Sequence, residues 1–291
     1  MNTQREQLIQ TWLQATLQTD QFEINFLAGD ASFRRYARIK LQNKTYMLMD
    51  APPEKEDCVP FVEIDEFFDK NGVRVPHIVA KDLSLGLLLL EDFGDVVLST
   101  LLNDDTVDQY YAQSFKQLID LQQIDAYQQL PAYSYEKLMT EMRLLTEWML
   151  PSLEIQPTEQ QLETIEQAFD FLAIEAINQP QVIVHRDYHS RNLMKIENEQ
   201  VLGVIDFQDA VIGADTYDLI SITRDAYVQW NAARVYGWFE VFYNLLPATA
   251  KENRSFEQFK RDADFMAIQR HLKILGIFVR LFERDGKSGY L

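Results

Sequence analysis

The chain has one cysteine in 291 residues and few basic side chains. Cys58 is alone, so no disulfide can form within the chain, as is usual in a reducing compartment. Lys and Arg number 27 against 45 Asp and Glu, which gives a net charge of −18. That charge opposes non-specific binding to nucleic acid and to anionic membranes, and we predict neither as a partner.

Long apolar runs are also missing. The most apolar stretch covers residues 85–90 and contains Gly86, so it is far too short to cross a membrane. The first residues lack the apolar region and the cleavage site of a signal peptide. We therefore predict a cytoplasmic protein. Hydrophobic residues make up 47% of the chain, which is enough for a sizeable core and argues against disorder.

The first 92 residues show a β-rich pattern. Thr3 and Glu6 form a capping box that starts a helix predicted over 4–18. A second helix, over 61–70, ends at Asn71-Gly72. Alternating apolar runs between turn residues predict strands over 22–27, 33–41, 45–49, 78–80 and 87–91.

Helical periodicity dominates after residue 92. It predicts helices over 104–124, 135–150, 158–178, 215–246 and 256–284. Three short β runs, at 182–184, 193–196 and 201–205, lie between the third and fourth of these helices. We therefore predict an α+β protein with two lobes, a β-rich N-lobe over residues 1–92 and a mostly helical C-lobe over residues 93–291.

One motif carries the chemistry. His185-Arg186-Asp187 is followed by Asn192 in the pattern H-R-D-x-x-x-x-N, and Asp206-Phe207 follows an apolar run downstream. This is the pattern of the catalytic and metal loops of kinases. Asp187 is the predicted catalytic residue, because a carboxylate can accept the proton of an acceptor hydroxyl. Asn192 and Asp206 are predicted ligands of Mg²⁺, which prefers oxygen donors.

The motif resembles the aminoglycoside phosphotransferase family of small-molecule kinases. His189 stands where protein kinases usually have Lys, and Asp206-Phe207-Gln208 replaces Asp-Phe-Gly. The resemblance implies a bilobal protein-kinase-like fold with ATP and Mg²⁺ as cofactors. It makes residues 1–92 the nucleotide-binding lobe and residues 93–291 the catalytic and substrate lobe.

Four segments narrow the resemblance. Residues 29–36, 49–57, 185–194 and 269–276 are similar to bacterial N-acetylmuramate/N-acetylglucosamine anomeric kinases of peptidoglycan recycling. This implies phosphorylation of the C1 hydroxyl of a small amino sugar by a monomer, and a further segment beyond Leu291. Two alternatives stay open: a kinase of another alcohol, such as an aminoglycoside, choline or homoserine, and a nucleotide-binding pseudokinase-like module.

The nucleotide contacts follow from the kinase pattern with one departure. Those predicted are Gly29, Asp30, Ser32 and Phe33 over the phosphates, and Glu91 and Phe93 beside the adenine. The strand over 45–49 contains no Lys where kinases place their phosphate-binding Lys. The sequence leaves four replacements open, which are Arg34, Arg35, Arg38 and Lys55.

The substrate contacts are predicted from the chemistry of the sugar. The lactyl carboxylate of muramate calls for an arginine, and Arg191, Arg224 and Arg270 are all candidates. Arg224 and Asp225 resemble a substrate-facing segment of the family and rank first. His189 and Arg191 complete the predicted substrate residues.

Overall fold

The computed structural model describes residues 3–27, 34–126 and 129–290. The chain forms two compact units: Met1–Asp95 with Met194–Gln208, and Val96–Leu193 with Asp209–Leu291. Our division at residue 92 had placed 194–208 in the second lobe, whereas this segment packs with the first unit. The sequence could not show this, because the segment follows the catalytic loop directly along the chain.

The first unit contains a five-stranded antiparallel sheet in the order β1-β2-β3-β5-β4. Its strands are β1 (Glu23–Phe26), β2 (Arg35–Leu41), β3 (Lys44–Asp50), β4 (Ile78–Asp82) and β5 (Leu87–Glu91). Each overlaps a strand predicted from alternation, although β3 is one residue longer at each end and β4 two residues longer at its end than predicted. A second, two-stranded sheet consists of β7 (Leu193–Lys195) and β8 (Leu202–Val204).

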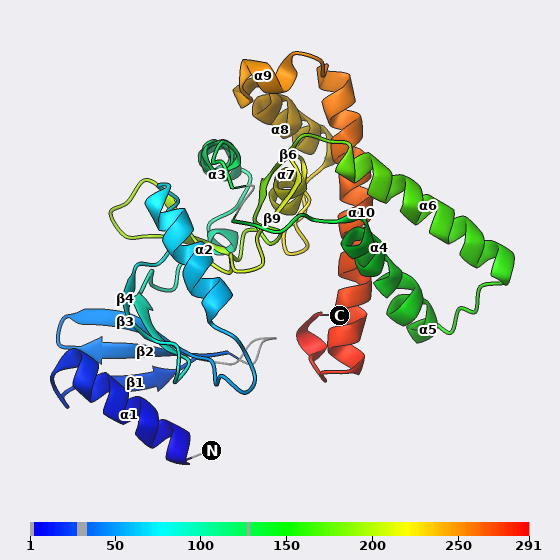
Figure 1. The fold of residues 1–291 in the computed structure, drawn as a ribbon. Coiled ribbons are helices and arrows are strands. Elements are labelled where there is room, and N and C mark those ends of the chain that lie inside the picture. Colours follow the sequence, from blue (N-terminus) through cyan, green and yellow to red (C-terminus); the bar gives the residue numbers. More distant parts are fainter. Residues whose placement is uncertain (1–2, 28–33, 127–128, 291) are drawn as a thin grey trace. The chain divides into compact units, whose positions relative to one another are not determined.

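Two helices flank the larger sheet on opposite sides (Figure 1). They are α1 (Thr3–Leu17) and α2 (Val59–Lys70). On α1, the fully buried Ile9 and Leu13 pack on Leu48 and Leu89 of the sheet. Ile9 and Leu13 share one helical face because positions four apart point the same way, and Leu48 and Leu89 share one face of the sheet because they are direct partners on β3 and β5.

Asp65 on α2 makes the stability of this unit depend on pH. Its side chain is 2% exposed, and Oδ2 has no hydrogen-bond partner among the described residues. Burial, together with Asp69 and Glu66, raises its pKa from 3.8 to about 7, although Lys81 opposes the shift. Because the folded-state pKa lies above the unfolded one, the folded state is favoured at low pH. Its stability falls as the pH rises from about 4 to about 7.

We therefore expect Asp65→Asn to stabilise the protein at pH 8 by about 2–4 kcal/mol, with little change at pH 4.5. Urea denaturation at the two pH values measures the difference. Glu63→Gln, at an exposed position of the same helix, is the matched control and should show no such pH dependence. An Asp65→Asn effect of equal size at both pH values would show that the carboxyl group does not titrate in this range.

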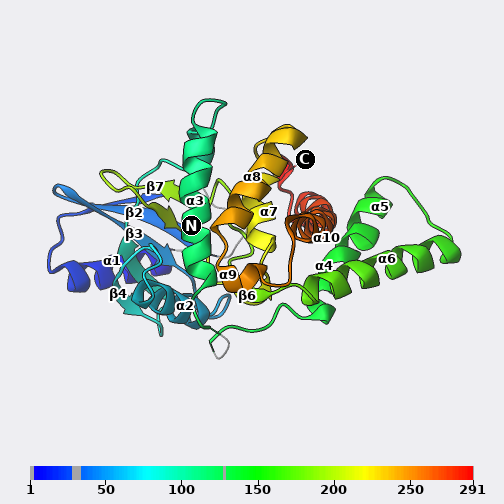
Figure 2. The same cartoon turned by 90° about the horizontal axis from the view of Figure 1, so that it is seen from above.

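The second unit is mainly helical. Its larger helices are α3 (Val107–Gln122), α4 (Tyr135–Leu144), α6 (Glu159–Ile177), α7 (Tyr217–Thr223), α8 (Ala232–Leu245) and α10 (Phe256–Glu283). Two short helices are α5 (Leu150–Ser152) and α9 (Ala248–Lys251), and a π-helical turn, Leu145–Met149, extends α4. The 28-residue α10 is contacted by α4, α6, α7 and α8 (Figures 1 and 2).

Two predictions for this unit were wrong. The single helix over 215–246 is two helices, α7 and α8, because Asn231 caps the start of α8 by accepting a hydrogen bond from the Arg234 N–H. We also missed β9 (Val211–Ala214), which pairs with β6 (Gln181–Val184). The predicted helices over 104–124, 158–178 and 256–284 match α3, α6 and α10 within a few residues.

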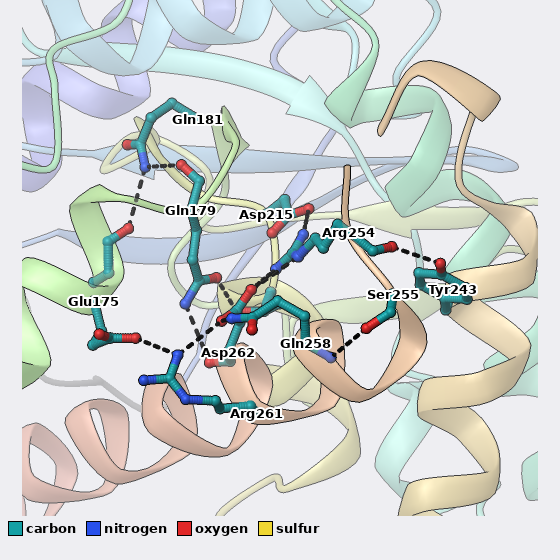
Figure 3. A network of polar contacts seen from close by, with 12 residues as sticks. Glu175, Gln179, Gln181, Asp215, Tyr243, Arg254, Ser255, Gln258, Arg261 and Asp262 are labelled. Carbon is teal, nitrogen blue, oxygen red and sulfur yellow. Dashed lines mark hydrogen bonds and ion pairs between the residues drawn. The ribbon is translucent and has the colours of Figure 1, made fainter. Parts of the chain in front are cut away.

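Buried ionic and amide side chains join α10 to the start of α7. The Arg254 guanidinium contacts Asp215 at 2.6 Å and Asp262 at 2.8 Å (Figure 3). Gln179 donates to the Asp262 carbonyl and accepts from the Thr216 hydroxyl. Arg254 is 8% exposed, so this network is held inside the unit rather than at its surface.

Gly276 marks the place where α10 crosses α4. A Cβ at this position would lie 2.3 Å from the carbonyl carbon of Leu144. We expect Gly276→Ala to destabilise the protein by about 1–3 kcal/mol, because the backbone of α4 would have to shift. Gly237→Ala in α8 is the control, since nothing lies within 4 Å of its new Cβ, and it should be neutral or mildly stabilising. Equal stabilities of the two variants in urea would contradict this account of the crossing.

No helix in the described part of the chain is both long and apolar enough to span a bilayer.

Candidate functional site

The predicted catalytic loop begins directly after β6. Asp218, in the first turn of α7, accepts hydrogen bonds from the backbone N–H groups of His185 at 2.6 Å and Arg186 at 3.1 Å. Burial raises the pKa of Asp218 to about 7, against the effect of these two bonds. Asp218 thus anchors the start of the loop.

Arg186 has a positive φ of 75°, a strained conformation for a side chain other than glycine. Its guanidinium forms a buried ion pair with Glu141 of α4 and lies 5.3 Å from the centre of the Tyr133 ring. These contacts hold the backbone in the strained conformation that presents the next residue, Asp187.

Asp187 lies on a loop closed by its own neighbours. The Asn192 side-chain amide donates to the Asp187 carbonyl at 3.0 Å, and the His189 backbone N–H donates to the same oxygen at 2.9 Å. Burial alone would raise the pKa of the Asp187 carboxyl, but Lys273 and Arg270 outweigh it and lower that pKa. The carboxylate is therefore ionised at neutral pH.

A cavity of about 80 Å³ opens beside Asp187 within the second unit. Its polar lining consists of Asp187, His189, Tyr217, Tyr227, Arg270 and Lys273. The apolar lining is Ala226, Ile274, Ile277 and Phe278. Burial lowers the pKa of His189, although Asp187 and Asp225 oppose the shift, so this imidazole is neutral at pH 7. The cavity therefore combines one anion, a neutral imidazole and two cations with an apolar wall.

The other predicted substrate residues lie outside this cavity lining. The carboxylate of Asp225 accepts from the backbone N–H groups of Ser190 at 2.9 Å and Tyr227 at 3.0 Å, so it positions the loop. The Arg191 guanidinium lies 3.7 Å from the centre of the Tyr227 ring. Arg224 pairs with Asp264 at 2.9 Å and lines a different cavity, of about 420 Å³.

Asp206 belongs to the first unit, where it follows β8. Its φ is 65°, and its Oδ1 accepts a hydrogen bond from the Gln208 side chain at 2.9 Å. The next residue, Phe207, is fully buried and packs on Phe61 at 5.0 Å and Phe68 at 5.9 Å between ring centres. Phe207 thus fixes the position of Asp206 relative to α2.

The first unit distinguishes among the four cations proposed for the missing strand lysine. Arg38 is held by Asp92 and Asp95, and Arg35 by Asp50, which Arg5 also contacts. Lys55 is exposed.

Arg34 pairs with Glu56 at 2.6 Å, with side chains 11% and 19% exposed. Burial raises the pKa of the neighbouring Tyr36 to about 12. The charge of Arg34 opposes this shift, and the charge of Asp206 adds to it. Arg34 is therefore the candidate whose charge acts on the same side chain, Tyr36, as the charge of Asp206.

The predicted adenine contacts lie at the end of β5. The Glu91 carboxylate is bound by Arg74, whose guanidinium also contacts Glu199 and lies 4.7 Å from the centre of the Phe93 ring. A Cβ at Gly203 would lie 2.4 Å from that ring, so the glycine makes room for it. Gly29, Asp30, Ser32 and Phe33 lie outside the described residues.

A profile of the phosphotransferase enzyme family matches residues 23–252. The chain belongs to this family. It is 41% identical over 266 residues to an N-acetylmuramate/N-acetylglucosamine kinase of Pseudomonas putida, covering 91% of this chain and 78% of the relative. A kinase of the same name from Pseudomonas aeruginosa is 40% identical over 270 residues, with the same two coverages. The family predicted from the loop motif is thus confirmed.

Solved structures of other kinases share the fold. An ethanolamine kinase of Plasmodium vivax aligns with a TM-score of 0.69 at 14% identity, covering 94% of this chain and 80% of its own. The streptomycin–ATP complex of aminoglycoside phosphotransferase APH(2")-IIa aligns with a TM-score of 0.64 at 16% identity, covering 97% and 95%. The predicted kinase-like α+β class, with a β-rich and a mainly helical part, is confirmed.

Sequence reasoning missed several residues beside Asp187, namely Glu141, Tyr217 and Lys273. One signal was available: Arg270 and Lys273 are two cations three positions apart on the apolar side of a long helix. Such a spacing puts both side chains on one helical face. Charged residues are rarely buried without a partner or a function, so this pair could have been singled out.

Proposed function

We propose that this family member transfers the γ-phosphoryl group of ATP to the C1 hydroxyl of N-acetylmuramate or N-acetylglucosamine, a step of cell-wall recycling. The observation that carries the proposal is an ionised Asp187 lining a cavity in a chain 40–41% identical to kinases of that name. The names of these relatives indicate a small-molecule acceptor.

Asp187 acts as the base that orients the acceptor. As the C1 oxygen attacks phosphorus, its O–H bond breaks and the proton passes to the Asp187 carboxylate. The new C1–O–P linkage forms while the bond between the γ-phosphorus and the bridging β-phosphate oxygen breaks, and ADP leaves. His189 lines the same cavity and is proposed to contact the sugar. Asp225 supports Ser190 and Tyr227 rather than the sugar itself.

Asn192 and Asp206 are the proposed Mg²⁺ ligands. They fit the ion chemically, because the Asn192 side chain carries an amide oxygen and Asp206 has an exposed carboxylate, and both are oxygen donors of the kind that Mg²⁺ prefers. Magnesium, when bound, supplies positive charge to the phosphate oxygens. The described residues contain no cluster of three or more His, Cys, Asp and Glu side chains suited to a metal. The proposed site therefore takes few protein ligands, as Mg²⁺ sites commonly do.

Arg34 is the proposed replacement for the strand lysine at the nucleotide phosphates. Its partner Glu56 then has the role that a helix glutamate has in other kinases. Backbone groups of Gly29, Asp30, Ser32 and Phe33 are proposed to cover the phosphates. Glu91 and Phe93 are proposed to contact adenine through the backbone, because the Glu91 carboxylate is already bound to Arg74.

The test is phosphoryl transfer from ATP to a panel of acceptors, with products identified by ³¹P NMR. We expect sugar 1-phosphates from N-acetylmuramate and N-acetylglucosamine, and no transfer to their methyl glycosides, in which C1 oxygen is blocked. Choline, homoserine and an aminoglycoside are the rival acceptors. Transfer to one of these without transfer to either sugar would rule out the proposed acceptor, and ATP binding without any transfer would rule out a kinase.

A further inference from the structure

Arg270 is a buried cation that has no counter-ion in direct contact among the residues that the structure describes. Its side chain lies in α10, is 3% exposed and lines the cavity beside Asp187. Its Nε and Nη1 atoms are buried and hydrogen-bond to no group in the described parts of the chain. Burying such a group is unfavourable unless an anion neutralises it. The guanidinium therefore has donors available for an anionic ligand.

Lys273, one turn further along α10, differs from Arg270 in this respect. Its ammonium group donates to the Tyr217 hydroxyl at 3.2 Å and lies 3.6 Å from the Glu141 carboxylate. These partners raise the pKa of Lys273 against the lowering effect of burial. The charge of Lys273 is thus balanced by groups of the same unit. Arg270 is the cation of the cavity whose charge no described group balances by direct contact.

The acidic groups near Arg270 have other roles. The charge of Arg270 helps to lower the pKa of Asp187 and opposes the burial that raises the pKa of Asp218. Asp218 is bound by two backbone N–H groups, and Asp187 is the proposed base. Neither carboxylate lies within ion-pair distance of the guanidinium, so a ligand carboxylate has no protein competitor at the free donors.

Of the three arginines considered for the lactyl group, Arg270 alone lines the Asp187 cavity. Arg224 is paired with Asp264 in a separate cavity, and Arg191 is stacked on Tyr227. The apolar lining of the cavity includes Ile274 and Phe278, which suit the methyl group of a lactyl ether rather than a phosphate. The Nε and Nη1 groups of Arg270 are charged N–H donors, and a carboxylate oxygen can accept a hydrogen bond from either.

Given the proposed function, we propose that Arg270 binds the lactyl carboxylate of N-acetylmuramate and so sets the preference for this acidic sugar over N-acetylglucosamine. The two sugars differ only in the lactyl ether, so the comparison isolates this contact. Arg270 is then a specificity residue that contacts the substrate and takes no proton in the reaction.

The experiment measures kcat/KM of the wild type and of Arg270→Met, which keeps the length of the side chain without the charge. Three acceptors are compared: N-acetylmuramate, its methyl ester and N-acetylglucosamine. We expect the wild type to use the ester about 10- to 100-fold less well than the acid, the size of effect that charged hydrogen bonds give. Arg270→Met should treat acid and ester alike, and it should lose about 10- to 100-fold more on the acid than on N-acetylglucosamine, whose loss reports only the effect of Arg270 on Asp187.

Each other outcome has a meaning of its own. An equal loss on all three acceptors would assign Arg270 to the phosphoryl group or to folding and overturn the carboxylate role. An unchanged preference for the acid in Arg270→Met would also overturn it. If Arg270→Met does not fold, the wild-type comparison is the test, because equal kcat/KM on the acid and on its methyl ester would exclude recognition of the carboxylate. Wild-type turnover of neither sugar, seen before any variant is made, would refute the proposed function itself and this inference with it.

Discussion

Replacing Asp187 with alanine should lower kcat about 10²- to 10⁴-fold while leaving nucleotide affinity nearly unchanged. The reason is the loss of the only carboxylate in the lining of the cavity, the group that would aim the acceptor oxygen and receive its proton. Steady-state kinetics with ATP and an amino sugar measure kcat. Calorimetric titration with ADP measures nucleotide binding separately from turnover.

The matched control is Asp120→Ala, an exposed aspartate on α3 of the same unit, which should leave both quantities unchanged. Lys273 and Arg270 together lower the pKa of Asp187 below the ordinary aspartate value of 3.8, despite its burial. The carboxylate therefore stays ionised as the pH falls toward that value. The wild type should therefore show no acidic loss of kcat/KM from this group above about pH 4. Full activity in Asp187→Ala would remove the aspartate from the mechanism.

The catalytic loop could be found from sequence because its chemistry requires fixed residue types at fixed spacing. Asp187 and Asn192 are five positions apart, and a local turn joins them through the Asn192 amide and the Asp187 carbonyl. Local hydrogen bonds of this kind depend on nearby residues, which a sequence displays directly. The strands of the first unit were predictable for the same reason, because alternation and turn residues act over short distances.

The partners of the loop were harder to predict because they come from distant parts of the chain. Glu141 reaches Arg186 across 45 positions, and Asp225 reaches Ser190 across 35. Nothing in the local pattern of either carboxylate shows which groups it will bind. The break between α7 and α8 was missed for a related reason: apolar residues continue through 224–231, whereas α7 ends at Thr223 and Asn231 starts a new helix as the N-cap of α8.

Removing the Arg254 side chain should have the largest effect on stability of any change considered. In Arg254→Ala, Asp215 (2% exposed) and Asp262 (7% exposed) lose the guanidinium that lies between them (Figure 3). Breaking a buried ion pair by removing one partner typically costs about 3–5 kcal/mol. Urea denaturation of the two proteins at pH 7.5 measures this loss.

Arg261→Ala is the matched control, because Arg261 lies on α10, the helix that begins just after Arg254, and pairs with Glu175 at 2.7 Å, but its side chain is 45% exposed. Exposed pairs contribute about 0–1 kcal/mol, so this variant should resemble the wild type.

The pH dependence of the stability loss in Arg254→Ala separates loss of charge from loss of packing. Burial already raises the pKa of Asp215, with Arg254 opposing the shift, so removing Arg254 must raise that pKa further. A raised carboxyl pKa favours the folded state at low pH, so the deficit of Arg254→Ala should be smaller at pH 5 than at pH 8. A deficit that is the same at both pH values would mean that the Arg254 side chain stabilises the unit by packing on Phe259, 4.9 Å from its guanidinium, rather than by neutralising Asp215.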